Sequence, residues 1–378
     1  MMHLDRNLYF KNAKRIVVKV GSSVLSQPGG LNLAVIRSIS KEISHLMDRG
    51  IEVILVSSGA MASGIKKIGL AKRPEDIPKQ QAVAAVGQAG LILAYESVFA
   101  RCGKKVAQIL LTSDDFNNRK RYLNARNTFN ALLSWGIVPI VNENDTVAVE
   151  EIKFGDNDNL AAILALLMDA DLLINLTDID GLFTANPREN PSAELIPIVD
   201  TIKKEIEKSA SKIPGVLGTG GMLSKVMSAK KVTSAGIPQV VANGKESGIL
   251  EALFSGKEKG TLFLPKEKRL ASRKCWIAFS LKPKGMLDID EGAANAVLNR
   301  GKSLLPSGIV HVDGEFGVGA PVEFKRKDGE VLGKGLVNYS SSDIRKILGL
   351  NSTRIKSILG DKPYDEIIHR DNLVITCE

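Results

Sequence analysis

Two polar runs in this chain gather carboxylates and amides beside apolar segments. Residues 142–146 follow the apolar segment 137–141, and residues 155–159 precede the apolar segment 160–168. Carboxylates placed this close repel one another, so a fold normally scatters them. A turn followed by a helix N-cap would explain either run alone. Two runs, each at the end of an apolar element, favour a site that binds a cation or a ligand rich in hydrogen-bonding groups.

Lysines accompany glycine-containing loops elsewhere in the chain. Lys19 lies in the apolar segment 15–20, before Gly21, and Lys225 follows the glycine-rich segment 218–221. An ammonium group within an apolar strand costs free energy unless it is paired. Glycine lets backbone N–H groups approach an anion, and helix N-termini favour negative charge. A single glycine pair usually marks a turn, but the joint arrangement indicates binding of a chain of phosphates.

Other common site chemistries find little support in the sequence. The near match to a P-loop at residues 296–303 lacks the first glycine, and no Gly-x-Gly-x-x-Gly opens the first helix. The four histidines and three cysteines are scattered, which indicates neither a zinc cluster nor a Ser-His-Asp triad. So few cysteines suit a reduced cytoplasm. The longest apolar run, 160–176, is interrupted by Asp169 and Asp171, so we expect no membrane span.

Strand-like and helical segments alternate through residues 15–255. This pattern predicts an α/β domain with a mostly parallel sheet sandwiched by helices. Gly50, Gly103, Gly136 and Gly236 fall between a helix and a strand, where a left-handed C-cap is expected. Ligands bind beyond the carboxyl ends of the strands in such sheets, which is where the polar motifs lie. We expect strands at 15–20, 52–57, 105–111, 137–141, 171–176 and 238–242, and helices at 33–49, 79–99, 125–135, 160–168 and 222–235.

The length of 378 residues suggests two or three domains. Residues 14–255 form the α/β domain, and residues 275–367 are rich in short β-like runs and form a small, mostly β domain. Between them, residues 256–274 carry seven basic and two acidic side chains. We interpret this segment as a basic linker, with a nucleic-acid contact as the alternative. In the small domain we expect a helix and two Asp-Gly hairpins, at 291–300, 313–314 and 328–329.

The motifs together resemble the amino acid kinase family, and the small domain resembles a PUA domain. The resemblance covers nearly the whole chain from residue 14, and the motifs are most similar to those of members that phosphorylate glutamate. One departure is Asn186, where many relatives have Asp. The kinase resemblance is carried by residues 19–23, 57–60, 142–146, 155–162, 177–178, 182–187 and 218–225, and the PUA resemblance by 290–293, 301–305 and 307–309.

The resemblance implies transfer of a phosphoryl group from ATP to the γ-carboxylate of L-glutamate, the first step of proline synthesis. Mg²⁺ would bridge the β- and γ-phosphates with few direct protein ligands. A carboxylate nucleophile has an ordinary pKa of about 4.3, so it is ionised at neutral pH and needs no general base. Catalysis would then consist of positioning and charge neutralisation.

The resemblance also implies roles for the residues that carry the phosphoryl chemistry. Lys19 and Lys225 would stabilise the transferring group from opposite sides, and Asp158 would hold both lysines in place. Glycines would let backbone N–H groups reach the phosphates or the substrate, at Gly21, Gly59 and Gly220. The nucleotide site would be lined by Lys19, Gly21, Thr177, Asp178, Thr219, Gly220, Gly221, Met222, Leu223, Ser224 and Lys225.

Three residues would bind the amino acid. Asp145 suits the α-ammonium group, Asn157 suits the α-carboxylate as a hydrogen-bond donor, and Ser58 completes the set. Asp156 would either contact the substrate or cap the following helix. Proline shares the α-carboxylate and an ammonium-like nitrogen with glutamate, so we expect this end product to compete here as a feedback inhibitor.

Two alternative functions remain open. A family member that phosphorylates N-acetylglutamate, aspartate or UMP would share most motifs, although N-acetylglutamate lacks the ammonium group that Asp145 suits. An RNA-binding protein is suggested by the PUA-like domain, but residues 275–378 carry 14 basic and 14 acidic side chains, and phosphate binding needs a net basic surface. We expect a cytoplasmic homo-oligomer with glutamate and ATP as partners, RNA as a minor candidate and no membrane.

Overall fold

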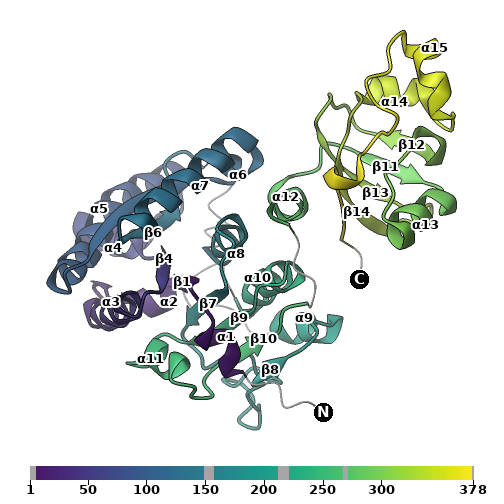
Figure 1. The fold of residues 1–378 in the computed structure, drawn as a ribbon. Helices are drawn as coiled ribbons and strands as arrows, with labels where there is room; N and C mark the ends of the chain where they lie inside the picture. Colours follow the sequence, from purple (N-terminus) through teal and green to yellow (C-terminus); the bar gives the residue numbers. More distant parts are fainter. Residues whose placement is uncertain (1–5, 149–156, 212–220, 267–270, 377–378) are drawn as a thin grey trace. The chain divides into compact units, whose positions relative to one another are not determined.

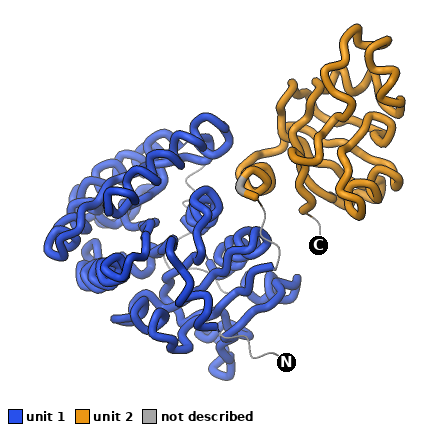
Figure 2. The backbone as a smooth tube through the Cα atoms, in the orientation of Figure 1, with its two compact units in different colours: residues 1–269 blue, residues 270–378 orange. Residues whose placement is uncertain are grey.

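The structure is a computed structural model, and it describes residues 6–148, 157–211, 221–266 and 271–376. The chain divides into two compact units, residues 1–269 and 270–378 (Figure 2). The first unit is built on an eight-stranded sheet and the second on a five-stranded sheet. The predicted α/β class and the predicted small β domain are both confirmed.

The sheet of the first unit has the strand order β5-β6-β4-β1-β7-β9-β10-β8 (Figure 1). Its described strand pairs are parallel, except that β10 runs antiparallel to β9. The carboxyl ends of the parallel strands therefore meet at one edge, where the polar motifs are brought together. The strands are β1 (Arg15–Val20), β4 (Glu52–Ser57), β5 (Lys105–Leu111), β6 (Ile137–Glu143), β7 (Leu172–Thr177), β8 (Ile198–Val199), β9 (Gln239–Asn243) and β10 (Thr261–Phe263), with a separate hairpin of β2 (Ser26–Gln27) and β3 (Gly30–Leu31).

Side chains of β1 alternate between the two faces of the sheet, as the pleat requires. Ile16, Val18 and Val20 enter an apolar cluster with residues of α3, α5 and α11, whereas Lys19 faces α8. Gly50, Gly103, Gly136 and Gly236 all have positive φ, which confirms the predicted left-handed C-caps. The helices are α1 (Asn7–Lys11), α2 (Ser22–Leu25), α3 (Leu33–Asp48), α4 (Ala60–Ile68), α5 (Ile77–Arg101), α6 (Ser113–Asn117), α7 (Arg119–Ser134), α8 (Asn157–Leu167), α9 (Lys204–Ser211), α10 (Met222–Ser234) and α11 (Ile249–Phe254).

The second unit is a five-stranded sheet in the order β12-β11-β13-β14-β15. The predicted hairpin at 328–329 joins the antiparallel strands β13 and β14, but the one predicted at 313–314 is wrong. There β12 pairs with β11, which itself lies parallel to β13, so the chain after Asp313 crosses over instead of folding back. The elements are α12 (Ser272–Cys275), β11 (Met286–Ile289), α13 (Glu291–Arg300), β12 (Ile309–Asp313), β13 (Pro321–Lys325), β14 (Val331–Leu336), α14 (Ser341–Ile347), α15 (Ile355–Leu359) and β15 (Leu373–Ile375).

The segment 256–274, predicted to be a basic linker, contributes a strand to the first sheet. Thr261, Leu262 and Phe263 form β10 and are fully buried between β9 and β8. Basic side chains lie on both sides of these three residues in the sequence. The net charge of the whole segment therefore suggested a linker and gave no sign of the strand. Only the part of the segment that follows β10 is therefore available to connect the two units.

Helix α5 is long and apolar enough to cross a membrane, by length and composition only. In the structure it packs on α3, α4 and β5 as a core helix. Its backbone approaches that of α4 closely, because a Cβ at Gly87 would lie 1.8 Å from the carbonyl oxygen of Ala60. A Cβ at Gly64 would likewise lie 1.9 Å from the carbonyl oxygen of Val83. Glycine at both positions lets the two helices meet backbone to backbone.

Because of this contact, replacing glycine by alanine in α5 should destabilise the protein, although alanine normally favours a helix over glycine. Replacing Gly87 by Ala should lower the free energy of unfolding of the first unit by about 1–3 kcal/mol, because the added methyl group overlaps α4. Propensity alone would make the same change stabilising. The matched control is Ala89→Gly at an exposed position of the same helix, which should cost about 0.5–1 kcal/mol. Urea denaturation measures both, and a Gly87→Ala chain more stable than the wild type would contradict the close contact.

Candidate functional site

Three charged side chains from three elements meet at the carboxyl edge of the sheet. Lys19 of β1 places its Nζ 2.5 Å from Oδ1 of Asp158, the second residue of α8. Lys225 of α10 places its Nζ 3.1 Å from Oδ2 of the same carboxylate. All three are buried, and Asp158 is fully so. We call these residues the lysine–aspartate cluster.

The two ammonium groups hold the carboxylate of this cluster in its ionised form. Burial alone would raise the pKa of Asp158, but the ammonium groups of Lys19 and Lys225 hold it well below its usual range. Separating any of these charges from water is costly unless its partner is in place. The cluster keeps two cationic groups in fixed positions, which suits charge stabilisation on a phosphoryl group.

Gly21 places no side chain beside the ammonium group of Lys19. A Cβ at Gly21 would lie 3.6 Å from Nζ of Lys19, so any side chain there would fill the space next to that group. Ser224 Oγ lies 2.5 Å from Oδ2 of Asp158 and 2.8 Å from the carbonyl oxygen of Gly221, so the two acceptors share its one hydroxyl hydrogen. Ser224 thereby joins the start of α10 to the carboxylate.

The end of β7 lies beside the start of α2. The backbone N–H of Gly21 donates to the carbonyl oxygen of Leu176, and Ser23 Oγ donates to Asp178 at 2.9 Å. Asp178 also accepts a 2.9 Å bond from Arg188, and these interactions lower its pKa against the effect of partial burial. Thr177 is buried at the end of β7. These loops lie where a nucleotide would be expected relative to the parallel strands.

The amino acid-binding candidates are partly joined by hydrogen bonds. Asn157 Nδ2 donates to Ser58 Oγ at 2.8 Å and to Asn142 Oδ1 at 3.0 Å. Both N–H groups of this amide are thereby engaged within the protein, and the expected role of Asn157 as a donor to a carboxylate stays a prediction. Its oxygen remains, buried and without a hydrogen-bond partner among the described residues.

Asp145 lies in the turn after β6 and is half-buried. Burial raises its pKa to about 6, against the opposing effect of Arg73. A carboxylate with so little solvation gains more than an exposed one from a bound ammonium group.

Some of the predicted residues do not join the cluster. Met222 packs in an apolar cluster with Leu182 and Val226, and Leu223 is exposed. Gly59 has φ of 110° and precedes α4. Thr219, Gly220 and Asp156 lie outside the described residues.

Sequence reasoning missed two buried polar residues near the site, Gln88 and Asn175, and assigned no separate role to Asn142 of the run 142–146. Gln88 and Asn142 are hydrogen-bonded to each other at 3.0 Å, and Asn175 of β7 is the register partner of Lys19. Asn175 is fully buried, and its side-chain oxygen and nitrogen have no partner in the described part of the chain. The signal that singled out Lys19, a polar residue inside an apolar strand, applies equally to Asn175.

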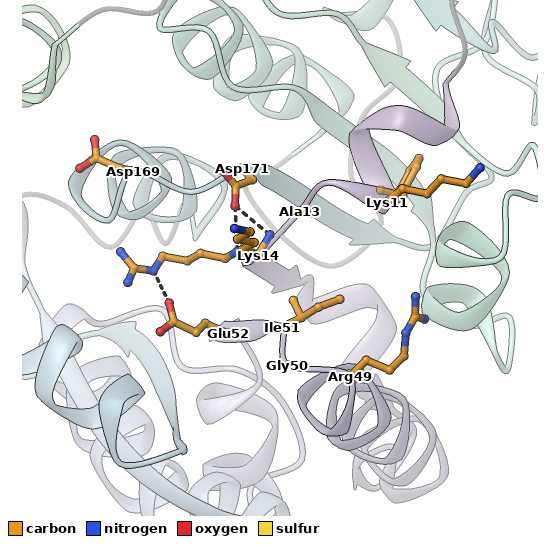
Figure 3. A pocket seen from close by; sticks show the side chains of 11 residues that line it. Lys11, Ala13, Lys14, Arg49, Gly50, Ile51, Glu52, Asp169 and Asp171 are labelled. Atoms are coloured by element: carbon orange, nitrogen blue, oxygen red, sulfur yellow. Dashed lines mark hydrogen bonds and ion pairs between the residues drawn. The ribbon is translucent and has the colours of Figure 1, made fainter.

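A cavity of about 700 Å³ lies at the opposite, amino edge of the sheet (Figure 3). Its acids are already paired: Glu52 accepts from Arg15 at 2.6 Å, and Asp171 accepts from the backbone N–H groups of Lys14 and Arg15. It contains none of the predicted site residues. Buried, mutually dependent charges lie only at the carboxyl edge among the described ion pairs, so we place the candidate site there.

Comparisons with known proteins identify two domain families in the chain. The family model described as "Amino acid kinase family" matches residues 14–243, and the PUA domain model matches residues 285–359. The chain belongs to the amino acid kinase family, and the resemblance stated from its motifs is confirmed.

Relatives of similar length are named glutamate 5-kinase. The one from Syntrophus aciditrophicus (strain SB) is 52% identical over 374 residues, which cover 99% of this chain and 97% of the relative. The one from Syntrophotalea carbinolica (strain DSM 2380 / NBRC 103641 / GraBd1) is 49% identical and covers 96% of this chain and 97% of the relative. The one from Geobacter sulfurreducens (strain ATCC 51573 / DSM 12127 / PCA) is 50% identical and covers 98% and 100%.

The lysine–aspartate cluster predicts a large loss of stability on neutralising its carboxylate. Asp158→Asn should lower the free energy of unfolding by about 3–5 kcal/mol, because it removes the counter-charge that Asp158 supplies to the buried Lys19 and Lys225. Asp48→Asn is the matched control, since Asp48 forms an exposed ion pair with Lys104 and should change stability little. Urea denaturation distinguishes the two, and equal, small losses in both variants would show that the cluster is not electrostatically coupled.

Proposed function

We propose that this chain transfers the γ-phosphoryl group of ATP to the γ-carboxylate of L-glutamate and so forms L-glutamyl 5-phosphate, the first step of proline biosynthesis. The observation that carries the proposal is the buried pair of lysines bridged by Asp158, with the amino acid-binding candidate Asn157 as the preceding residue of α8. The names of relatives that are about half identical over nearly the full chain support the choice of glutamate.

The proposed mechanism needs positioning and charge stabilisation only. The γ-carboxylate is already ionised at neutral pH and attacks the phosphorus in line with the leaving ADP oxygen. Lys19 and Lys225 would neutralise the charge that spreads over the equatorial oxygens, and Asp158 would keep the two ammonium groups apart and in place. The segment of Thr177 and Asp178, with the start of α10 from Gly221 to Ser224, would line the nucleotide.

Mg²⁺ fits this site as a partner of the phosphates. Among the described residues no group of three or more metal-ligating side chains is present, and Asp158 is bonded by both lysines. The donor set therefore suits a metal held mainly by phosphate oxygens and water. When bound, the ion would supply charge neutralisation on the β- and γ-phosphates.

The proposed function predicts a narrow choice of acceptor. ADP release measured with glutamate, aspartate, N-acetylglutamate and UMP should give turnover with glutamate and little with the others. Turnover with aspartate or UMP but none with glutamate would overturn the proposal.

Removing one lysine should abolish most of the activity with glutamate. Lys225→Ala should lower kcat by about 10²–10⁴-fold, because one of the two charges on the transferring group is lost. Lys230→Ala is the matched control on the same helix, where the lysine pairs with Glu207 outside the cluster. Steady-state kinetics at saturating ATP compares them, and an equal effect of the two changes would argue against a direct role for Lys225.

The raised pKa of Asp145 predicts a pH dependence of glutamate binding. Its carboxylate is ionised above pH 6 and attracts the α-ammonium group, but it becomes protonated below that pH. The KM for glutamate should therefore rise about tenfold between pH 7 and pH 5, since each pH unit below the pKa removes about nine-tenths of the ionised form. Asp145→Asn should raise KM throughout and remove this dependence, so a parallel rise in the variant would assign the titration to another group.

Further partners are proposed on chemistry alone. Proline would compete with glutamate at Asp145 and Asn157, because it offers the same α-carboxylate beside a cationic nitrogen. RNA finds less support, since the charge of residues 275–378 is balanced. We propose a cytoplasmic homo-oligomer, and sedimentation with and without proline would test both the assembly and the effector.

A further inference from the structure

A chain of buried amides runs from α5 to the amino acid-binding candidates. Gln88 Oε1 accepts from Asn142 Nδ2 at 3.0 Å, and Asn142 Oδ1 accepts from Asn157 Nδ2 at 3.0 Å. Asn157 Nδ2 also donates to Ser58 Oγ at 2.8 Å. The exposed fractions of Gln88, Asn142 and Asn157 are 8%, 5% and 5%. We call these three residues the amide relay.

The hydrogen bonds of the amide relay run in one direction, from Asn157 through Asn142 to Gln88. The oxygen and nitrogen of an amide are nearly equal in size, so shape alone does not decide which of them faces a neighbour. Once Gln88 presents its oxygen, Asn142 must turn its N–H₂ group toward it and its oxygen toward Asn157. Asn157 must then turn its own N–H₂ group inward, which leaves Oδ1 as its one uncommitted polar atom.

Oδ1 of Asn157 is a buried acceptor that lacks a donor among the described residues. A buried acceptor in this state is costly until a ligand supplies a donor. An α-ammonium group has three N–H donors, and the half-buried carboxylate of Asp145 is a second acceptor of the type it requires. Ser58 Oγ acts as the acceptor toward Asn157, so its hydroxyl hydrogen can be donated to a carboxylate.

We propose that Gln88 is a positioning residue that sets the specificity of the amino acid site for a free α-ammonium group. It acts through Asn142, which fixes Asn157 with Oδ1 as an acceptor for that group. The inference rests on the proposed function, since it names the part of glutamate that each atom recognises. Gln88 itself contacts no substrate in this assignment.

The test compares L-glutamate with glutarate, which has both carboxylates but no ammonium group. In Gln88→Met the end of the relay is lost, and the KM for glutamate should rise about tenfold, the usual effect of one lost hydrogen bond to a charged group. The kcat, the KM for ATP and the kcat/KM for glutarate should stay within about twofold. Gln88→Glu keeps an acceptor toward Asn142 and should restore the KM for glutamate to within about threefold of the wild type.

Controls separate this role from a general effect on the helix. Glu96→Met, at an exposed position of α5, should leave all constants unchanged. Gln88→Ala serves as a second variant if Gln88→Met folds poorly, and it should give the same selective loss with glutamate.

Three results would overturn the inference. The first is an unchanged KM for glutamate in Gln88→Met, and the second is a fall in kcat/KM for glutarate as large as that for glutamate. The third is a KM for glutamate that is higher in Gln88→Glu than in Gln88→Met, which would mean that the amides donate in the opposite direction. A wild-type chain that fails to phosphorylate glutamate would overturn the proposed function itself, and the inference with it. The assay of the wild-type chain with glutamate reveals this failure before any Gln88 variant is measured.

Discussion

The fully buried carboxylate of Asp158 constrains the rest of the kinase unit. It is placed between two buried ammonium groups, and its negative charge offsets the cost of burying their two positive charges. Lys19 comes from the central strand, Asp158 from the first turn of α8 and Lys225 from the first turn of α10. The three elements must therefore be docked in one arrangement before any of these charges is stable.

The same arrangement divides the candidate site into two parts. Asn157 and Asp158 are consecutive at the start of α8, and adjacent helical residues point about 100° apart. Asp158 thus meets the lysines, while Asn157 meets Ser58 and the amide relay. A single helix turn sets the distance between the phosphoryl end and the amino acid end of the site.

Local sequence patterns were sufficient to predict the central strands and helices of the first unit. The β-branched run 15–20 and the glycine that follows α3 at Gly50 appear in the structure as predicted, because apolar periodicity and the φ > 0 preference of glycine act within a few residues. The strand β10 escaped prediction, since three buried residues among basic ones give no period to detect. The crossover after Asp313 escaped for a related reason, because an Asp-Gly turn does not say which strand will be its neighbour.

For the site, the sequence determined that Lys19 needs a counter-charge, because an ammonium group in an apolar strand cannot stay unpaired. The sequence also placed acids and amides after strands, and the carboxyl ends of parallel strands lie together at one edge of the sheet. Only the tertiary structure brought Asn157, Asn142 and Gln88 into one hydrogen-bonded chain. Hydrogen-bond direction depends on side chains that are distant in sequence and are brought into register by the docking of α5 on the sheet, and no local pattern carries that information.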